Sequence, residues 1–290
     1  MKTVIISGAS GFIGNALSEY FSKRGDRIIH IVRRSGASKY ESISVDKFDV
    51  GFVSQFNSND TVVINLSGAN IGAKKWTDTY KREIIDSRVK TTRNLVKVLD
   101  KSGIHLINAS ATGYFGDRGD EILTESSASG LGFLSEVCRE WESATGNYSQ
   151  LLITRFGVVL GKNGGAFDKM ITPFKMLAGG HIGTGKQWIP WIHITDLIAL
   201  IAFAVDNKIT GIMNCVSPEP ITYRHFADTA GKVLGRPSKL NVPTFAIKIL
   251  LGEQAELVLN SQRVIPQRAM SLGFKYQFAT MESALRNLLN

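Results

Sequence analysis

The segment from Val4 to Gly14 constrains the fold of this chain more than any other. Its first residues are apolar and mostly β-branched, which predicts a short buried strand. Glycines follow at Gly8, Gly11 and Gly14, and apolar residues at helical spacing continue from Phe12. A strand, a glycine turn and a helix in this order bind dinucleotide diphosphates, because the backbone comes close and the helix N-terminus presents unpaired N–H groups. The alternative is a plain strand–helix turn in which glycine serves packing.

This pattern predicts a dinucleotide site. The predicted cofactor contacts in the turn are Gly8, Ser10, Gly11, Phe12, Ile13 and Gly14.

A pair of arginines bears on which dinucleotide is bound. The segment 27–32 predicts a second strand, and Arg33 and Arg34 follow it. NAD-selective sites carry an acidic residue near this position for the ribose 2′-hydroxyl. Arginine would instead pair with a 2′-phosphate. The sequence therefore favours NADP over NAD, the alternative being two solvated arginines in a loop.

Strands and helices alternate through the first two thirds of the chain. Residues 61–65 predict a buried strand, and Leu66, Ser67 and Gly68 follow at its carboxyl end, where small residues fit beside a cofactor. We predict an α/β fold, a Rossmann-type doubly wound parallel sheet. It would occupy residues 1–216, with loop insertions at about 162–187. Prolines punctuate the remainder, so residues 217–290 are predicted to form a small, mainly helical C-terminal lobe on the substrate side.

Composition narrows the classes of partner. The net charge of +9 permits nucleic acid, but the basic residues are dispersed and lack interleaved aromatics, so we expect no nucleic-acid partner. Cys138 and Cys215 lie far apart and predict neither a disulfide nor a metal site. No stretch has the apolar length of a membrane span or a secretory signal. We therefore expect a cytoplasmic protein with no membrane partner.

These landmarks together resemble the extended short-chain dehydrogenase/reductases, the NAD-dependent epimerase/dehydratase-like superfamily. The resemblance rests on the glycine spacing, the strand motif at 60–68, the Ser110–Gly116 stretch and the late motif at 192–197. The phrases at 133–142, 155–161, 190–194 and 264–268 are similar to a subgroup called "epimerase family protein", which has a C-terminal domain of unknown function. That closer resemblance implies that Glu83 and Arg88 also contact the cofactor. Their alternative is an exposed helix face.

One departure from the superfamily bears on catalysis. Its active members use a Tyr-x-x-x-Lys pair, in which the lysine lowers the pKa of the proton-exchanging tyrosine. No such pair occurs here. Alignment places Leu134 and Cys138 at these positions, or Phe133 and Val137 after a shift of one residue. None of these side chains can replace the pair.

The remaining catalytic candidates are Ser110 and Tyr114. Ser110 could instead cap a strand end, and Tyr114 could simply pack on its loop. Arg155, at the end of a predicted strand, is a candidate for binding an anionic substrate, or for pairing with a carboxylate.

The sequence thus predicts an NADP-binding protein that is an oxidoreductase or epimerase acting on an unknown small molecule. The alternative is an NADP-binding sensor or regulatory protein that has lost catalysis. The oligomeric state stays open, with a homodimer among the alternatives.

The arginine pair leads to a selectivity test. Arg33→Asp should weaken NADPH binding by about 1–3 kcal/mol, far more than it weakens NADH binding, because only NADPH carries the 2′-phosphate. Titration calorimetry with both nucleotides measures this. An equal loss for both would contradict the assignment.

Overall fold

A parallel seven-stranded sheet forms the centre of the protein, within the residues that the computed structural model describes, 1–33, 38–162 and 164–289. In spatial order its strands are β12 (Gly211–Cys215), β7 (Leu151–Phe156), β5 (His105–Ala111), β4 (Thr61–Asn65), β1 (Thr3–Ser7), β2 (Arg27–Val32) and β3 (Glu41–Ser44). The chain order reverses direction between β1 and β4, so their carboxyl ends flank the switch point where ligands bind in such sheets. The predicted α/β doubly wound class is confirmed.

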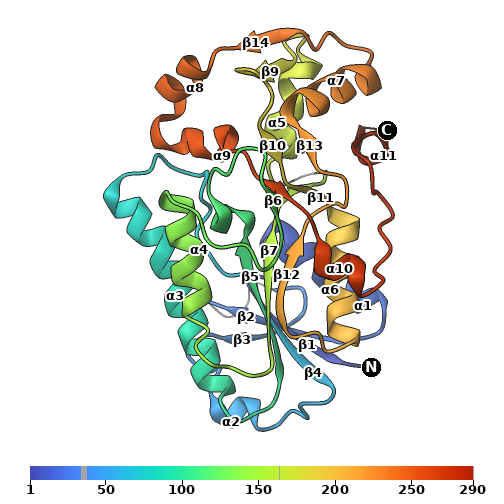
Figure 1. The fold of residues 1–290 in the computed structure, drawn as a ribbon. Helices are drawn as coiled ribbons and strands as arrows, with labels where there is room; N and C mark the ends of the chain where they lie inside the picture. Colours follow the sequence, from blue (N-terminus) through green and yellow to red (C-terminus); the bar gives the residue numbers. More distant parts are fainter. Residues whose placement is uncertain (34–37, 163, 290) are drawn as a thin grey trace.

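Helices cover both faces of this sheet (Figure 1). They are α1 (Phe12–Lys23), α2 (Val50–Val53), α3 (Asp78–Leu99), α4 (Phe133–Ser143) and α6 (Ile194–Asp206). Successive strand residues point to opposite faces, so Ile6 packs in the core with α1 and α6 while Ile5 packs in the core with α3. Both side chains are fully buried. No helix in the described residues combines the length and apolarity needed to cross a membrane.

The C-terminal lobe lies above the carboxyl ends of the strands and is mainly helical (Figure 1). Its elements after the main sheet are β13 (Ile221–Thr222), α7 (Tyr223–Leu234), β14 (Leu240–Val242), α8 (Thr244–Leu251), η2 (Gly252–Ala255), α9 (Glu256–Leu259) and α11 (Met281–Leu289). Helix α10 (Gln267–Ser271) instead packs beside β12, and its Ala269 is buried in the core with α1 and α6 (Figure 1). Short strands connect the lobe to the sheet: β6 (Ile122–Leu123), β8 (Val158–Leu160), β10 (Trp188–Ile189), β11 (Trp191–His193) and β15 (Arg263–Val264).

The segment 162–187 differs from the predicted loop insertion. It contains α5 (Phe167–Lys175) and β9 (Gly180–Ile182), and β9 pairs with β14. Phe167, Ile171 and Phe174 recur at helical spacing and bury against α7 and α11. This segment therefore packs with the C-terminal lobe. The glycines at both ends of the segment indicated loops and made the helical spacing between them hard to recognise in the sequence.

A buried polar layer joins the sheet to α3 and α4 beneath the carboxyl edge. Asn65 Nδ2 donates to Asn108 Oδ1 (2.7 Å) and to Thr92 Oγ1 (3.0 Å). Trp141 Nε1 also donates to Thr92 Oγ1 (3.0 Å). Asn65, Asn108 and Thr92 have no exposed surface. Since an unpaired buried polar group is costly, this layer fixes how α3 and α4 seat on β4 and β5.

Removal of one member of this layer should destabilise the fold. Asn108→Ala removes one of the two acceptors of the buried Asn65 amide and leaves a cavity in the layer, so we expect the free energy of unfolding to fall by about 2–3 kcal/mol. Urea denaturation measures the change. The control is Asn147→Ala at an exposed position, which should change stability by less than about 0.5 kcal/mol. A small change for both variants would contradict the role given to the layer.

Candidate functional site

The turn after β1 is built by close approach of backbone atoms. Gly8 has φ +78°, and a Cβ there would lie 2.7 Å from the carbonyl carbon of Leu66. A Cβ at Gly14 would lie 2.5 Å from the Gly8 oxygen and 2.7 Å from the Cα of Ala9. Gly11 is less restricted, with its nearest contact at 3.3 Å. Gly8 and Gly14 are therefore required for the tight packing of β1, α1 and β4, and the turn has the shape of a dinucleotide-binding turn.

The N-terminus of α1 is left open to a ligand. Its N-cap residue is Gly11, no side chain caps it, and its first turn has no acidic residue. The first-turn amides and the helix dipole therefore favour an anion. Ser10 and Gly11 are exposed, while Phe12 packs against Gly164 and Gly165. Ile13, at the second helical position, is half-buried.

A second lip of the crevice is formed after β4. Leu66 and Ser67 are half-buried and Gly68 is exposed. The hydroxyls of Ser67 and Ser7 are 2.6 Å apart, and the Ser67 amide donates to Asn65 Oδ1 (3.2 Å). These bonds tie the lip to the end of β1 and to the polar layer. Leu66 and Ser67 thus contact the glycine turn at Gly8, and Gly68 follows them in the chain.

Arg88 reaches from α3 to this second lip. Its guanidinium carbon lies 2.8 Å from where a Cβ on Gly68 would be, and 5.0 Å from the ring centre of Trp141. Its NH1 donates to the Ile84 carbonyl oxygen (2.9 Å). Burial lowers the pKa of Arg88. No carboxylate in the described part of the chain forms an ion pair with it. A half-buried cation without a carboxylate fits an anionic ligand.

The other predicted charged contacts lie apart from Arg88. Glu83 is exposed on α3 and lies 3.7 Å from Lys74. The structure therefore does not bring Glu83 together with Arg88. Arg33 is exposed immediately after β2, at the carboxyl end of the strand beside β1. Arg34 lies outside the described residues.

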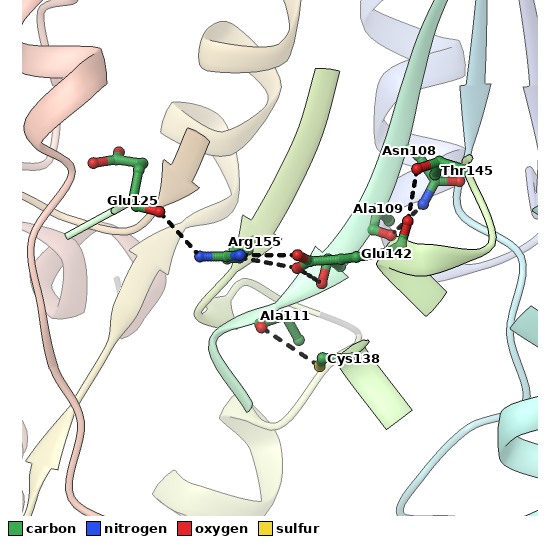
Figure 2. A network of polar contacts seen from close by, with 9 residues as sticks. Asn108, Ala109, Ala111, Glu125, Cys138, Glu142, Thr145 and Arg155 are labelled. Carbon is green, nitrogen blue, oxygen red and sulfur yellow. Dashed lines mark hydrogen bonds and ion pairs between the residues drawn. The ribbon is translucent and has the colours of Figure 1, made fainter. Parts of the chain in front are cut away.

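Figure 2 shows a buried ion pair at the centre of a polar network beside β5. Arg155 Nε and NH2 donate to the two carboxylate oxygens of Glu142 (2.9 and 2.8 Å). Ser110 Oγ donates to Glu142 Oε1 at 2.6 Å. Ser110 and Arg155 are each 2% exposed. The Ser110 hydroxyl is therefore oriented, and only its lone pairs remain for another partner.

This geometry decides between the alternatives for Arg155. Its guanidinium pairs with a carboxylate, and its NH1 donates to the Glu125 carbonyl oxygen (3.4 Å). A substrate anion would have to displace Glu142 from a buried bidentate pair, which would leave that carboxylate uncompensated. The expectation that Arg155 binds an anionic substrate is thus not supported by its position.

Tyr114 packs beneath the same arginine. The Arg155 guanidinium carbon lies 3.5 Å from the Tyr114 ring centre. The ring also packs edge-on against Phe115 from the short helix η1 (Thr112–Phe115). Tyr114 is half-buried, and its ring is the partner of a cation rather than an open phenol. Packing is therefore the arrangement that the structure shows.

Helix α4 presents Leu134 and Cys138 to the site, which selects one of the two alignments. A Cβ on Gly113 would lie 3.2 Å from Leu134 Cβ and 3.6 Å from Cys138 Sγ. Phe133 instead packs on Trp76, and Val137 is buried with Trp76 and Tyr80. Cys138 Sγ donates to the Ala111 carbonyl oxygen (3.6 Å). Burial raises the pKa of this thiol to about 11, so it stays protonated and packed at neutral pH.

A cleft of about 740 Å³ opens where the C-terminal lobe meets α3 and α4. Its charged lining includes Lys81, Arg82, Arg139, Glu253 and Glu256. Burial raises the pKa of Glu256. Neither Ser110 nor Glu142 lines this cleft. The cleft and the buried network are therefore adjacent features of α4 rather than one cavity.

Glu142 is the site residue that sequence reasoning missed. No motif in the sequence singled out its side chain, yet it holds both Ser110 and Arg155. Leu134, Cys138 and Glu142 recur every four residues, so they share one face of α4. That spacing was the available signal.

The chain matches known proteins over nearly its whole length. Residues 4–215 match the NAD dependent epimerase/dehydratase family, and residues 242–288 match a domain of unknown function (DUF1731). An Arabidopsis thaliana protein, "Epimerase family protein SDR39U1 homolog, chloroplastic", is 39% identical over 303 residues, covering 99% of this chain and 86% of its own.

Solved structures are also similar. The human epimerase family protein SDR39U1 (isoform 2), crystallised with NADPH, aligns with a TM-score of 0.89 and 30% identity, covering 99% of this chain and 98% of its own. A nucleoside-diphosphate sugar epimerase from Corynebacterium glutamicum aligns with a TM-score of 0.78 and 30% identity, covering 99% of this chain and 58% of its own. The resemblance inferred from the motifs is confirmed: this chain belongs to the NAD dependent epimerase/dehydratase family.

Proposed function

We propose that the chain binds NADPH in the crevice between the glycine turn and the lip at residues 66–68. The observation that carries this proposal is the backbone contact of Gly8 with Leu66 beside the uncapped N-terminus of α1. That arrangement leaves amide groups for a diphosphate. The human relative crystallised with NADPH supports the choice of cofactor.

Each residue predicted to contact the cofactor has a role in this proposal. The turn residues Gly8, Ser10, Gly11, Phe12, Ile13 and Gly14 would hold the diphosphate. Arg33 would bind the 2′-phosphate, with Arg34 beside it in sequence. Leu66, Ser67 and Gly68 would contact the other side of the nucleotide, and Arg88 would supply a positive charge there. A cofactor contact by Glu83 has less support, because Glu83 is exposed and lies near Lys74.

We further propose an oxidoreductase or epimerase reaction on an unidentified small molecule. The bound nicotinamide would donate a hydride as NADPH and accept one as NADP+, and an epimerase needs both steps in turn. The Ser110 hydroxyl donates a hydrogen bond to Glu142, so its oxygen lone pairs can accept from a substrate hydroxyl and orient it. Tyr114 is the nearby phenol and stays a proposed acid, although its ring packs under Arg155. Glu142 and Arg155 act as positioning residues, since they would act only through Ser110 and Tyr114.

The alternative function is an NADPH-binding sensor without catalysis. Leu134 and Cys138 favour it, because they face the site where the superfamily has its tyrosine and lysine and neither exchanges protons at neutral pH. We also propose that the Rossmann-type domain and the C-terminal lobe meet near residue 216. The protein is proposed to be cytoplasmic and to form a homodimer. A nucleic-acid partner is not part of the proposal.

Arg88 gives a binding test that differs from that of Arg33. Arg88→Met should weaken NADPH and NADH alike, by about 1–3 kcal/mol, because its cation faces the lip rather than the 2′-phosphate. Titration calorimetry measures both affinities. Arg93→Met, at an exposed position on the same helix, is the control and should change neither. Unchanged affinity in Arg88→Met would remove Arg88 from the cofactor site.

Turnover separates the enzyme from the sensor. NADPH-loaded protein is followed by nicotinamide absorbance against a panel of carbonyl compounds. NADP+-loaded protein is followed by NMR against nucleotide sugars, because an epimerase must first accept a hydride from its substrate. For an enzyme, Ser110→Ala should lower kcat on the order of 100-fold, and Glu142→Gln should lower it too, while the exposed Ser143→Ala should not. Tight NADPH binding without turnover on any compound would favour the sensor. Full turnover in Ser110→Ala would exclude Ser110 as a catalytic group.

A further inference from the structure

The far end of the C-terminal lobe carries an apolar helix with no partner in the described structure. None of the residues of α8 is buried. Phe245 is 66% exposed, Ile249 80% and Leu250 71%. Isolated exposed apolar residues are ordinary, but three large ones on one short helix form a patch that needs an explanation.

The neighbouring strand and turn extend this patch. Strand β14 immediately precedes α8, and its Leu240 is 52% exposed. Leu240 pairs with Gly180 of β9, a few residues after Met176 and Leu177, which are 72% and 54% exposed. Figure 1 shows β9, β14 and α8 together at the end of the molecule away from α2. We call residues 175–182 and 239–251 the distal face.

The charged residues within the distal face are all basic. Asp228 lies just outside it and accepts a hydrogen bond from Ser238 Oγ (3.5 Å). Residues 169–187 contain three lysines and residues 229–252 contain three lysines and an arginine, and neither segment contains an aspartate or a glutamate. Lys175, Arg236, Lys239 and Lys248 are exposed, and no ion pair among the described residues includes them. Lys232 is excluded from this set, because it pairs with Glu282. The patch thus combines apolar side chains with uncompensated cations.

The combination of exposed apolar side chains and unpaired cations indicates which kind of partner can cover the distal face. A second copy in a symmetric dimer would place the same lysines against each other, in a protein that already carries a net charge of +9. Protein interfaces are also depleted in lysine. In contrast, protruding Phe, Ile and Leu side chains flanked by Lys are the composition of helices that lie in the interface of an anionic bilayer.

We propose that the distal face is a docking surface for anionic membranes. Phe245, Ile249 and Leu250 enter the headgroup–acyl boundary, and Lys175, Lys239 and Lys248 contact the lipid phosphates. We expected no membrane partner because the sequence lacks a membrane-spanning segment. A helix that lies flat on a bilayer needs no such segment. The docking does not involve the cofactor crevice.

Vesicle co-sedimentation of the full chain tests this. The protein should sediment with phosphatidylcholine vesicles containing about 30% phosphatidylglycerol, and it should not sediment with phosphatidylcholine alone. Binding should weaken as salt is raised. Phe245→Ser with Ile249→Ser should lower the partition coefficient about tenfold or more, and Lys248→Gln about fivefold. NADPH titration and circular dichroism on the same variants confirm that they are folded.

The matched controls lie at the opposite end of the molecule. Val50→Ser on α2 and Lys97→Gln at the end of α3 are also exposed substitutions, and they should leave vesicle binding unchanged. Three outcomes would overturn the proposal: no sedimentation with anionic vesicles at low salt, equal binding of the double variant, or a wild-type dimer by light scattering that the double variant converts to monomer. Binding of polyglutamate with the same dependence on Phe245 would instead identify an acidic protein as the partner.

Discussion

The backbone contact between the β1–α1 turn and the end of β4 is the constraint on which the rest of the site depends. Gly8 and Leu66 approach so closely that a single Cβ would force them apart. Gly14 allows α1 to lie directly on the same turn. This contact brings the first-turn amides of α1 to the switch point of the sheet, where no side chain competes for them. This point of the structure is therefore suited to an anion.

Two buried polar features keep the surrounding helices in place. The layer of Asn65, Thr92 and Asn108 ties α3 to β4 and β5. Above it, Glu142 joins α4 to β7 through Arg155 and to β5 through Ser110. A buried ion pair adds little net stability, whereas loss of one partner costs about 3–5 kcal/mol. The pair is therefore better understood as fixing the position of Ser110 than as a source of stability.

Much of the fold followed from local patterns, and the prediction of an α/β doubly wound sheet was confirmed. Strands such as Thr61–Asn65 and the long helix α3 have strong periodicity, and periodicity reports burial directly. The glycine turn could be located for a different reason, because its strand, turn and helix are adjacent in the sequence. The prediction that residues 162–187 form a loop was wrong. The helix α5 in this segment is hard to recognise in the sequence because it is only nine residues long and contains Pro173.

The details of the candidate site needed the structure because they depend on pairs distant in sequence. Nothing near Arg155 in the chain indicates that its partner is Glu142 rather than a substrate. The choice between Leu134 and Phe133 depends on the rotation of α4 against η1, which the Gly113 contact shows. Arg88 meets Gly68 only because α3 crosses the end of β4. Such contacts come from packing between elements, and local sequence patterns do not encode them.

Amide hydrogen exchange of the two lips of the crevice, with and without saturating NADPH, tests the central claim most directly. If the α1 N-terminus and the residues after β4 enclose the nucleotide, exchange should slow in residues 8–14 and in residues 66–68 together. Amides in α2, remote from the crevice, should serve as the reference and remain unchanged. Exchange that is the same in both lips with and without NADPH would contradict the proposed cofactor site.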